Sequence, residues 1–373
     1  MYWYQLLYND YKVMIVDIHG INLGIYPLLR NGIYVLQTFS WYINAWEMKK
    51  ILNSLPDDYD KSRYFKVLTN STEEYININF LCMEKNIECI SWNNACSLNI
   101  NKFINIYIPP IEERKYNVIM ISRNNKFKRH FLTKELNDIL YIVKETKSNL
   151  QYYKKDNIHC NCNHDVLCDN CNFVSLNRID LSLSFTNKTH EIKYNIRNVQ
   201  DYIIKSKIGI ILSSIEGACY SSLEYLLCGI PVVSTFSTGG RDEFYNEDNS
   251  LICQENCESV KQTIEQALLK LRNKEFNPVK IKNMAFEQYQ YYQDIYLNVV
   301  QDIINQEQIN INIKTEIFDN YFIRTFDKEY TLNNFIKLIN PVVTNSTNDY
   351  ISSIEIQNDI RNKNIIAKTV IYG

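Results

Sequence analysis

The chain has 373 residues, of which 46% are hydrophobic and 22% charged, and its formal net charge is −2 at pH 7. This length provides for two domains with a substantial core, and the balanced charge argues against nucleic acid as a general partner. No run of 18 apolar residues occurs, so no transmembrane segment is expected, which leaves only peripheral membrane contact open. The first residues lack a basic region followed by an apolar core, so no secretory signal is predicted.

The N-terminal third has the pattern of a small α/β domain. Apolar and β-branched runs predict strands over 13–19, 33–37, 65–71 and 87–92, an extended segment over 104–109, and a helix over 72–85. His19 ends the first of these strands, where it would face a cleft, and we favour a half-buried or surface histidine over a catalytic one. Pro109–Lys115, with two prolines and a run of charges, is the best linker candidate.

Further along, the sequence predicts a βαβ unit. A buried strand over 207–212, a polar loop over 213–217, a helix over 218–228 and a second strand from Val232 follow one another. Gly229 suits the left-handed cap after the helix, and Pro231 prevents its continuation. A right-handed crossover is expected for such a unit.

Two glutamates in this unit indicate a ligand site. In open α/β sheets ligands bind beyond the carboxyl ends of the strands, which places Glu216 in a loop over that edge. The first free N–H groups of the helix, around Gly217 to Tyr220, would face the same crevice and attract phosphate. Glu224 should lie about two turns along the helix. Each element alone is generic, but their order and spacing together favour a site.

A second group of candidate residues lies upstream. The segment 116–123 reads as a strand that ends in Arg123, and Lys128 follows five residues later. Because Lys126 and Arg129 are also basic, a solvated basic helix start would explain the spacing by itself.

At these residues the chain resembles the retaining nucleotide-sugar glycosyltransferases of the GT-B class, group 1 or family 4, of bacterial type. The signature of that family is Glu-Gly, a second Glu eight positions on, Gly-x-Pro-Val-Val and a Gly-Gly loop. Here these elements are Glu216-Gly217, Glu224, the segment 229–233 and Gly239-Gly240. The family also places an Arg and a Lys at the spacing of Arg123 and Lys128.

The resemblance implies an α/β fold of two Rossmann-like domains that face a cleft, with a shortened N-terminal domain and a C-terminal extension. It assigns 1–112 to the acceptor domain, 113–280 to the donor domain with a Cys-rich insert over 156–173, and 281–373 to a crossover helix and extension. Within the last part, a helix over 281–305 is expected to return to the first domain.

The resemblance also implies roles for individual residues. Arg123 and Lys128 would hold the donor diphosphate, Glu216 the transferred sugar and Glu224 the ribose. The nucleotide-sugar site would further include Gly217, Ala218, Cys219, Gly239 and Gly240. Cys219 departs from the family pattern, because a second glycine often stands there, and the donor could be tilted as a result. The usual opening strand and Gly-rich acceptor loop are not recognisable, so no acceptor residue is assigned.

The implied activity is transfer of a sugar from a nucleoside-diphosphate sugar to a glycan, lipid or small molecule, with retention of configuration and no required metal cofactor. Two alternatives stay open. The first is a hydrolase or epimerase of the same fold that acts on a nucleotide sugar. The second is a non-catalytic protein that binds a nucleotide sugar or zinc.

Cysteines cluster in the middle of the chain. Cys160, Cys162, Cys168 and Cys171 lie with two histidines within 13 residues. Four such ligands suit a structural zinc ion, although the Cys-x-Cys half is tight, and a reduced solvent-facing loop is the alternative. The total of 11 cysteines is odd and unevenly placed, which favours a reducing, cytoplasmic location over a disulfide framework.

Overall fold

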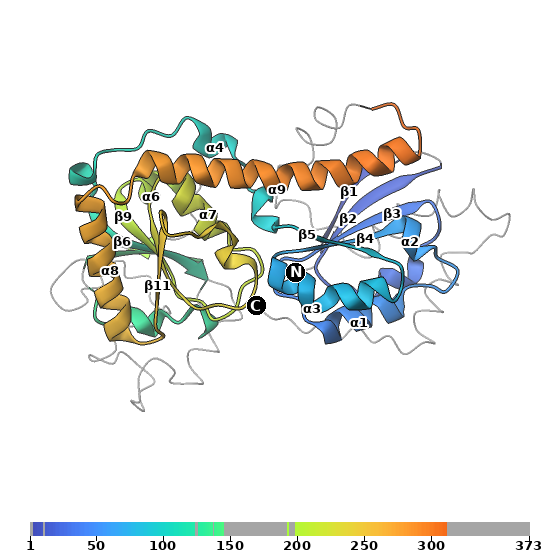
Figure 1. The fold of residues 1–373 in the computed structure, drawn as a ribbon, viewed down its shortest axis with the longest axis horizontal. Helices are drawn as coiled ribbons and strands as arrows, with labels where there is room; N and C mark the ends of the chain where they lie inside the picture. Colours follow the sequence, from blue (N-terminus) through green and yellow to red (C-terminus); the bar gives the residue numbers. More distant parts are fainter. Residues whose placement is uncertain are drawn as a thin grey trace. The chain divides into compact units, whose positions relative to one another are not determined.

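The computed structural model describes residues 3–9, 12–123, 126–136, 138–144, 192–193 and 198–311 (Figure 1). The chain divides into two compact units, one formed by the residues up to Asn99 and from Gln290 onward, the other by Ile100–Tyr289. The predicted linker, Pro109–Lys115, packs within the second unit. The reason is Arg114, which is buried and donates hydrogen bonds to the carbonyls of Pro109 (3.2 Å) and Ser206 (3.3 Å).

The N-terminal unit contains a five-stranded sheet in the order β1-β2-β3-β4-β5. Its strands are β1 (Trp3–Asn9), β2 (Met14–His19), β3 (Ile33–Thr38), β4 (Phe65–Thr69) and β5 (Glu88–Ser91). Strands β2 to β5 pair in parallel, whereas β1 runs antiparallel to β2. The sequence pattern does not predict β1, because a register shift between Leu6 and Tyr8 interrupts the period-two alternation of a strand.

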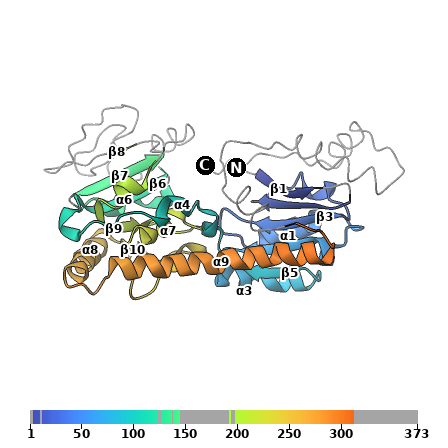
Figure 2. The same ribbon diagram turned by 90° about the horizontal axis from the view of Figure 1, so that it is seen from above.

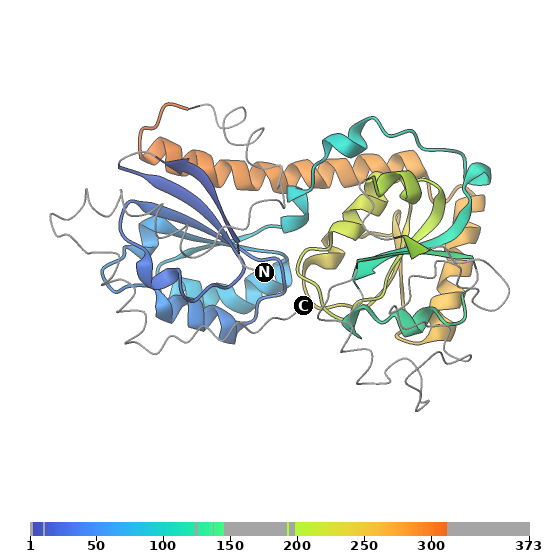
Figure 3. The same cartoon turned by 180° about the vertical axis from the view of Figure 1, so that it is seen from behind.

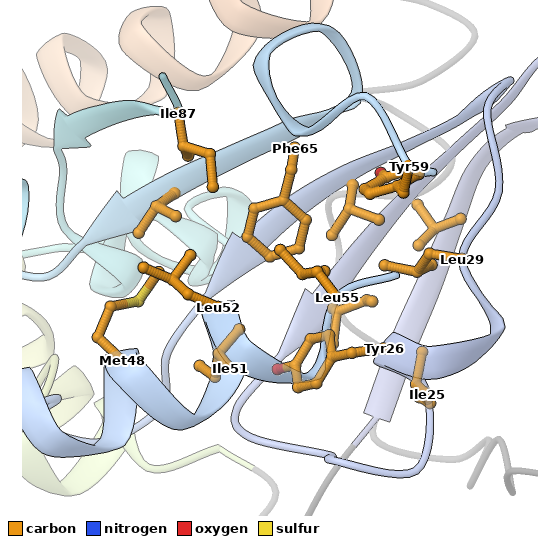
Figure 4. Packing of buried hydrophobic residues seen from close by; sticks show 14 of the residues in the cluster. Ile25, Tyr26, Leu29, Met48, Ile51, Leu52, Leu55, Tyr59, Phe65 and Ile87 are labelled. Atoms are coloured by element: carbon orange, nitrogen blue, oxygen red, sulfur yellow. The ribbon is translucent and has the colours of Figure 1, made fainter. Parts of the chain in front are cut away.

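The helices between these strands begin at polar caps. They are α1 (Ala45–Ser54), α2 (Lys61–Tyr64) and α3 (Thr72–Met83), whose caps are Asn44, Asp60 and Ser71. Helices α1 and α3 cover one face of the sheet (Figure 3). Met48, Ile51 and Leu52 of α1 belong to the same buried cluster as Phe65 of β4 (Figure 4). The local turns of the unit include η1 (Tyr26–Leu28) and η2 (Asn94–Ser97).

The long helix α9 (Pro278–Gln306) contributes residues to both units (Figure 2). In the N-terminal unit, the indole Nε1 of Trp92 donates to the carbonyl of Tyr292 at 2.8 Å. The Tyr296 hydroxyl donates to Asp17 at 3.0 Å, and Arg63 pairs with Glu307, just beyond the helix, at 2.6 Å. The helix expected over 281–305 is therefore present, and its second half is bonded to the N-terminal sheet. None of the helices described is long and apolar enough to cross a bilayer.

The second unit contains a six-stranded sheet in the order β11-β10-β9-β6-β7-β8, in which every pairing is parallel. Its strands are β6 (Tyr116–Arg123), β7 (Ile139–Lys144), β8 (Ile192–Lys193), β9 (Ser206–Ile211), β10 (Val232–Thr235) and β11 (Ser250–Cys253). The chain proceeds from β6 to β7 and β8 on one side, then continues with β9 on the other side of β6. The strand order thus reverses between β6 and β9, where sheets of this kind bind ligands.

Helices and turns of the second unit include α4 (Asn101–Ile104), η3 (Ile111–Glu113), α6 (Gln200–Ile203), α7 (Tyr220–Leu227) and α8 (Cys257–Arg272). The segment expected over 104–109 forms no strand, because α4 ends at Ile104 and the backbone that follows pairs with none of the described strands. Two prolines supply no N–H for a ladder there, and Ile108 instead packs beside Gly229.

Helix α7 differs from its predicted bounds at its start. It begins at Tyr220, so Glu224 lies about one turn along it and not two. Its end agrees with the prediction, since Gly229 has a φ of +66°. The helix packs closely on β9 through the ring of Tyr225, which lies over Gly209. The Tyr225 hydroxyl accepts a hydrogen bond from the N–H of Ile121 in β6, at 2.7 Å.

We expect Gly209→Ala to lower the free energy of unfolding by about 1–3 kcal/mol. A Cβ at Gly209 would overlap three atoms of the Tyr225 ring, the farthest at 2.8 Å, and the bonded hydroxyl hinders the ring from moving away. Denaturant unfolding of the single and double variants measures this effect. The cost of Gly209→Ala should shrink in a Tyr225→Leu background, and an equal cost in both backgrounds would contradict the clash.

Candidate active site

Three loops meet at the carboxyl edge of the second sheet, after β6, β9 and β10. The N–H of Ser214 donates to the carbonyl of Phe127 at 3.0 Å. The N–H of Glu216 donates to Thr238 at 3.0 Å, and the N–H of Thr238 donates back to Ser214 at 3.2 Å. The loop that carries Glu216 is therefore bonded on both sides. This edge is the one at which parallel α/β sheets bind their ligands.

Lys128 and Glu216 form an ion pair at the point where the strand order reverses. Nζ of Lys128, which ends the turn η4 (Lys126–Lys128), bonds to Oε1 of Glu216. The Lys128 side chain is 14% exposed and that of Glu216 is 6% exposed. Burial of either charge alone would be costly, so each one stabilises the other in this position. The structure thus brings together two of the residues to which the resemblance assigned donor binding.

The start of α7 lies beside this pair. Cys219 is the N-cap residue, and its side chain makes no capping hydrogen bond. Burial raises the pKa of the Cys219 thiol, the Glu216 carboxylate raises it further and Lys128 lowers it, so the thiol is close to both charges. Gly217 and Ala218 are buried between Glu216 and this cap. A helix start without a side-chain cap, next to a cation, is suited to an anionic group.

Glu224 and Arg123 are placed differently. Glu224 is half-buried, and burial raises its pKa to about 7, an effect that Lys102 partly offsets. Arg123 is exposed at the end of β6. No hydrogen bond or ion pair joins either charged group to another described side chain. The structure brings neither of them into contact with the Lys128–Glu216 pair, and their roles at the ribose and the diphosphate stay predictions.

The Gly239-Gly240 turn follows β10. Gly239 has φ +102° and ψ −165°, a backbone conformation that is essentially restricted to glycine, and Gly240 opens the turn η6 (Gly240–Phe244). Arg241, the next residue, is fully buried and donates to the carbonyls of Ser213 (2.8 Å) and Thr235. The sequence motifs assign no role to Arg241. The one feature of the sequence that could have indicated a role is the Arg241-Asp242 pair directly after the two glycines.

His19 lies in the N-terminal unit and is 2% exposed, so the expected half-buried or surface position is wrong. Its Nδ1 is 2.9 Å from the Thr38 hydroxyl, which donates to Asp17 at 2.6 Å. Thr38 must therefore accept from the imidazole, which assigns the proton to Nδ1. The Nε2 atom lies 3.4 Å from the amide nitrogen of Asn94. The histidine is thus one link in a buried chain of hydrogen bonds.

The predicted zinc ligands Cys160, Cys162, Cys168 and Cys171 lie outside the described residues. Within the described parts of the chain, no group of three or more His, Cys, Asp or Glu side chains is arranged to hold a metal ion.

Comparison with known proteins identifies the architecture. No protein-family model and no curated protein matches the sequence. Among solved structures, Anabaena Alr3699/HepE in complex with UDP is similar with a TM-score of 0.52 and 11% identity, over 76% of this chain and 78% of that one. The same protein in complex with UDP-glucose gives the same values. The Candida albicans trehalose-6-phosphate phosphatase N-terminal domain has a TM-score of 0.50 and 13% identity, over 78% and 70% of the two chains.

These similarities, with the two largely parallel sheets, identify an α/β fold of two Rossmann-like units, the GT-B fold. The predicted fold class is therefore confirmed. At 11–13% identity the comparison concerns the fold, and the activity has to be argued from the residues.

We expect the raised pKa of Glu224 to make stability depend on pH. A glutamate in an unfolded chain releases its proton near pH 4.5, whereas folded Glu224 retains it up to about pH 7. The folded state binds more protons between these values, so the free energy of unfolding should fall as pH rises through this range. Glu224→Gln should remove the contribution of Glu224 to this fall in the free energy of unfolding, which is on the order of 1–3 kcal/mol. Denaturant unfolding at pH 5 and pH 8 measures the difference.

The exposed Glu265 of α8 offers the matched control. Glu265→Gln should keep the pH dependence of the wild type. Burial also raises the pKa of Glu74, to about 8. Its effect on the free energy of unfolding is the same in the wild type and in both variants, so it cancels in the comparison. Equal pH dependence in Glu224→Gln and the wild type would contradict the burial of an ionisable Glu224.

Proposed function

We propose that this protein is a retaining glycosyltransferase, related to family 4 of the GT-B class, which transfers a sugar from a nucleoside-diphosphate sugar to an acceptor. The observation that carries the proposal is the largely buried Lys128–Glu216 pair at the strand-order reversal, next to the start of α7. The sequence motif around Glu216 and the fold similarity to a protein crystallised with UDP-glucose support it.

The proposed chemistry centres on the departing diphosphate. When the bond between the sugar C1 and the phosphate oxygen breaks, the nucleoside diphosphate leaves with the electron pair and gains negative charge. Lys128 and Arg123 would meet this charge with charged hydrogen bonds worth about 1.5–3 kcal/mol each. The α7 dipole adds about 0.3–1 kcal/mol, so the two side chains dominate. Our proposal needs no divalent metal for this step.

The ion pair suggests how Glu216 would contribute. Without donor, the Lys128 ammonium and the Glu216 carboxylate neutralise one another. A bound diphosphate would supply Lys128 with an alternative anion, which would free Glu216 to accept hydrogen bonds from hydroxyls of the transferred sugar. Glu224 would bind the ribose, and Gly239 and Gly240 would admit the sugar close to the backbone. A hydroxyl oxygen of the acceptor, whether glycan, lipid or small molecule, would form the new bond to C1 with retention of configuration, and its proton would pass to the departing diphosphate.

The proposal also includes a cytoplasmic location and a structural zinc ion on the cysteines at 160, 162, 168 and 171, without a catalytic role for that metal. Metal analysis of the purified protein should find about one zinc per chain, which Cys168→Ser removes. Metal-free protein of unchanged stability would exclude the zinc without affecting the proposed transfer reaction.

The donor can be identified by thermal shift against UDP-, GDP- and ADP-sugars. A ligand at about a hundred times its dissociation constant stabilises the folded state by about 2.7 kcal/mol. Product analysis with the labelled donor then separates the activities. Transfer to an acceptor supports the proposal, free sugar indicates a hydrolase, an altered donor indicates an epimerase, and binding without any turnover indicates a non-catalytic protein.

We expect Lys128→Ala and Arg123→Ala each to lower the turnover number on the order of a hundredfold, because each removes a cation that meets charge developing in the transition state. Steady-state kinetics with the identified donor measures this. Lys134→Ala, which removes an exposed cation beyond the same loop, is the control and should change turnover less than about twofold. A loss of only a fewfold in Lys128→Ala would contradict its role at the diphosphate.

A further inference from the structure

Arg241 is a charged side chain with no exposed surface, placed between the carboxyl ends of β9 and β10. Its guanidinium donates to the carbonyl of Ser213 at 2.8 Å and to that of Ile211 at 3.5 Å, both on the β9 side. On the β10 side it donates to the carbonyl of Thr235. Its acidic partner is the adjacent Asp242, at 2.5 Å from Nε and 3.1 Å from a terminal nitrogen.

The geometry of these bonds requires an arginine. A guanidinium is planar and presents its N–H groups in a rigid fork, so one side chain can hold carbonyls of two separate strands at a fixed spacing. A lysine would keep the charge but would lose this fork. Because a buried charge is stable only when its hydrogen bonds are made, displacement of either strand end would leave part of the guanidinium unsatisfied.

The carbonyls held by Arg241 lie where the two site loops begin. Ser213 leads into Glu216 through a short loop, and Thr235 leads into the Gly239-Gly240 turn. The two loops bond to each other directly, since the N–H of Glu216 donates to Thr238 at 3.0 Å. Fixing both strand ends therefore fixes the position of the Glu216 carboxylate relative to the glycine turn.

We infer that Arg241 is a positioning residue for the proposed transfer reaction, which fixes the Glu216 loop against the Gly239-Gly240 turn before the donor binds. The inference rests on the proposed function for its kinetic consequence, but its structural content is independent of the activity. Arg241 has no exposed surface and so acts through the two loops without touching a ligand. Such preorganisation lowers the barrier of the chemical step more than it alters ground-state binding.

Arg114 provides a matched control on the same strand. It is also a buried arginine, and it donates to the carbonyl of Ser206 at the amino end of β9, at 3.3 Å. Arg241→Lys and Arg114→Lys thus both replace a buried fork by an ammonium, at opposite ends of one strand. A merely structural role predicts similar behaviour of the two variants.

The test compares backbone hydrogen exchange and kinetics in the full-length variants. Arg241→Lys should speed exchange at Glu216 and Thr238 at least about tenfold, with exchange in the middle of β9 unchanged. The turnover number of Arg241→Lys, measured with the donor identified by thermal shift, should fall at least about tenfold. Its KM for the donor should stay within about threefold of the wild-type value. Arg114→Lys should leave both loops and both kinetic constants within about threefold.

Each other outcome has a defined meaning. If both variants behave alike, or if Arg241→Lys leaves loop exchange and turnover unchanged, the inference is overturned. If Arg241→Lys does not fold, Asp242→Asn, which removes only the acidic partner, should show the same loop exchange and kinetic changes to a smaller degree, and unchanged values would overturn the inference. If the wild type binds and turns over no nucleotide sugar, the proposed function fails, while hydrogen exchange still decides whether Arg241 fixes the two loops.

Discussion

The ion pair between Lys128 and Glu216 is the interaction on which the candidate site depends. The two residues belong to loops after different strands, and their charges are tolerated in a largely buried place because each neutralises the other. The surrounding backbone keeps them in reach, through the bond from Ser214 to Phe127 on one side and from Glu216 to Thr238 on the other. Neither side chain can leave this place alone without exposing the other as an unpaired charge in a largely buried environment.

The sheet explains why these loops meet at all. Parallel strands place all their carboxyl ends at one edge, and sheets of this kind bind ligands at that edge where the strand order reverses, which is here between β6 and β9. Contacts within the sheet and with α7 hold the strands that carry these loops. Tyr225 packs on Gly209 and bonds to Ile121 of β6, while Arg241 joins the ends of β9 and β10.

Much of this could be predicted from the sequence, because the signals are local. An apolar strand, a glycine at a left-handed cap and a proline define the βαβ unit around Gly229, and the structure agrees. The rest depends on contacts between distant residues. The bulge in β1 breaks the strand pattern, and Ile108 is drawn to Gly229 and not to a strand partner. The burial of His19 and the role of Arg241 follow from neighbours that no spacing rule supplies.

The polar groups at the sheet edges are bonded differently in the two units. In the N-terminal unit, the polar groups satisfy one another: Thr38 bonds both to Asp17 and to His19. In the second unit, the Ser213 and Thr235 hydroxyls are buried without a hydrogen-bond partner among the described residues, and the half-buried Glu224 has a pKa raised to about 7 by burial. Buried hydroxyls are normally hydrogen-bonded, so those of Ser213 and Thr235 are exceptions at this edge. Both hydroxyls belong to residues whose backbone carbonyls Arg241 holds, and the same edge carries the Lys128–Glu216 pair.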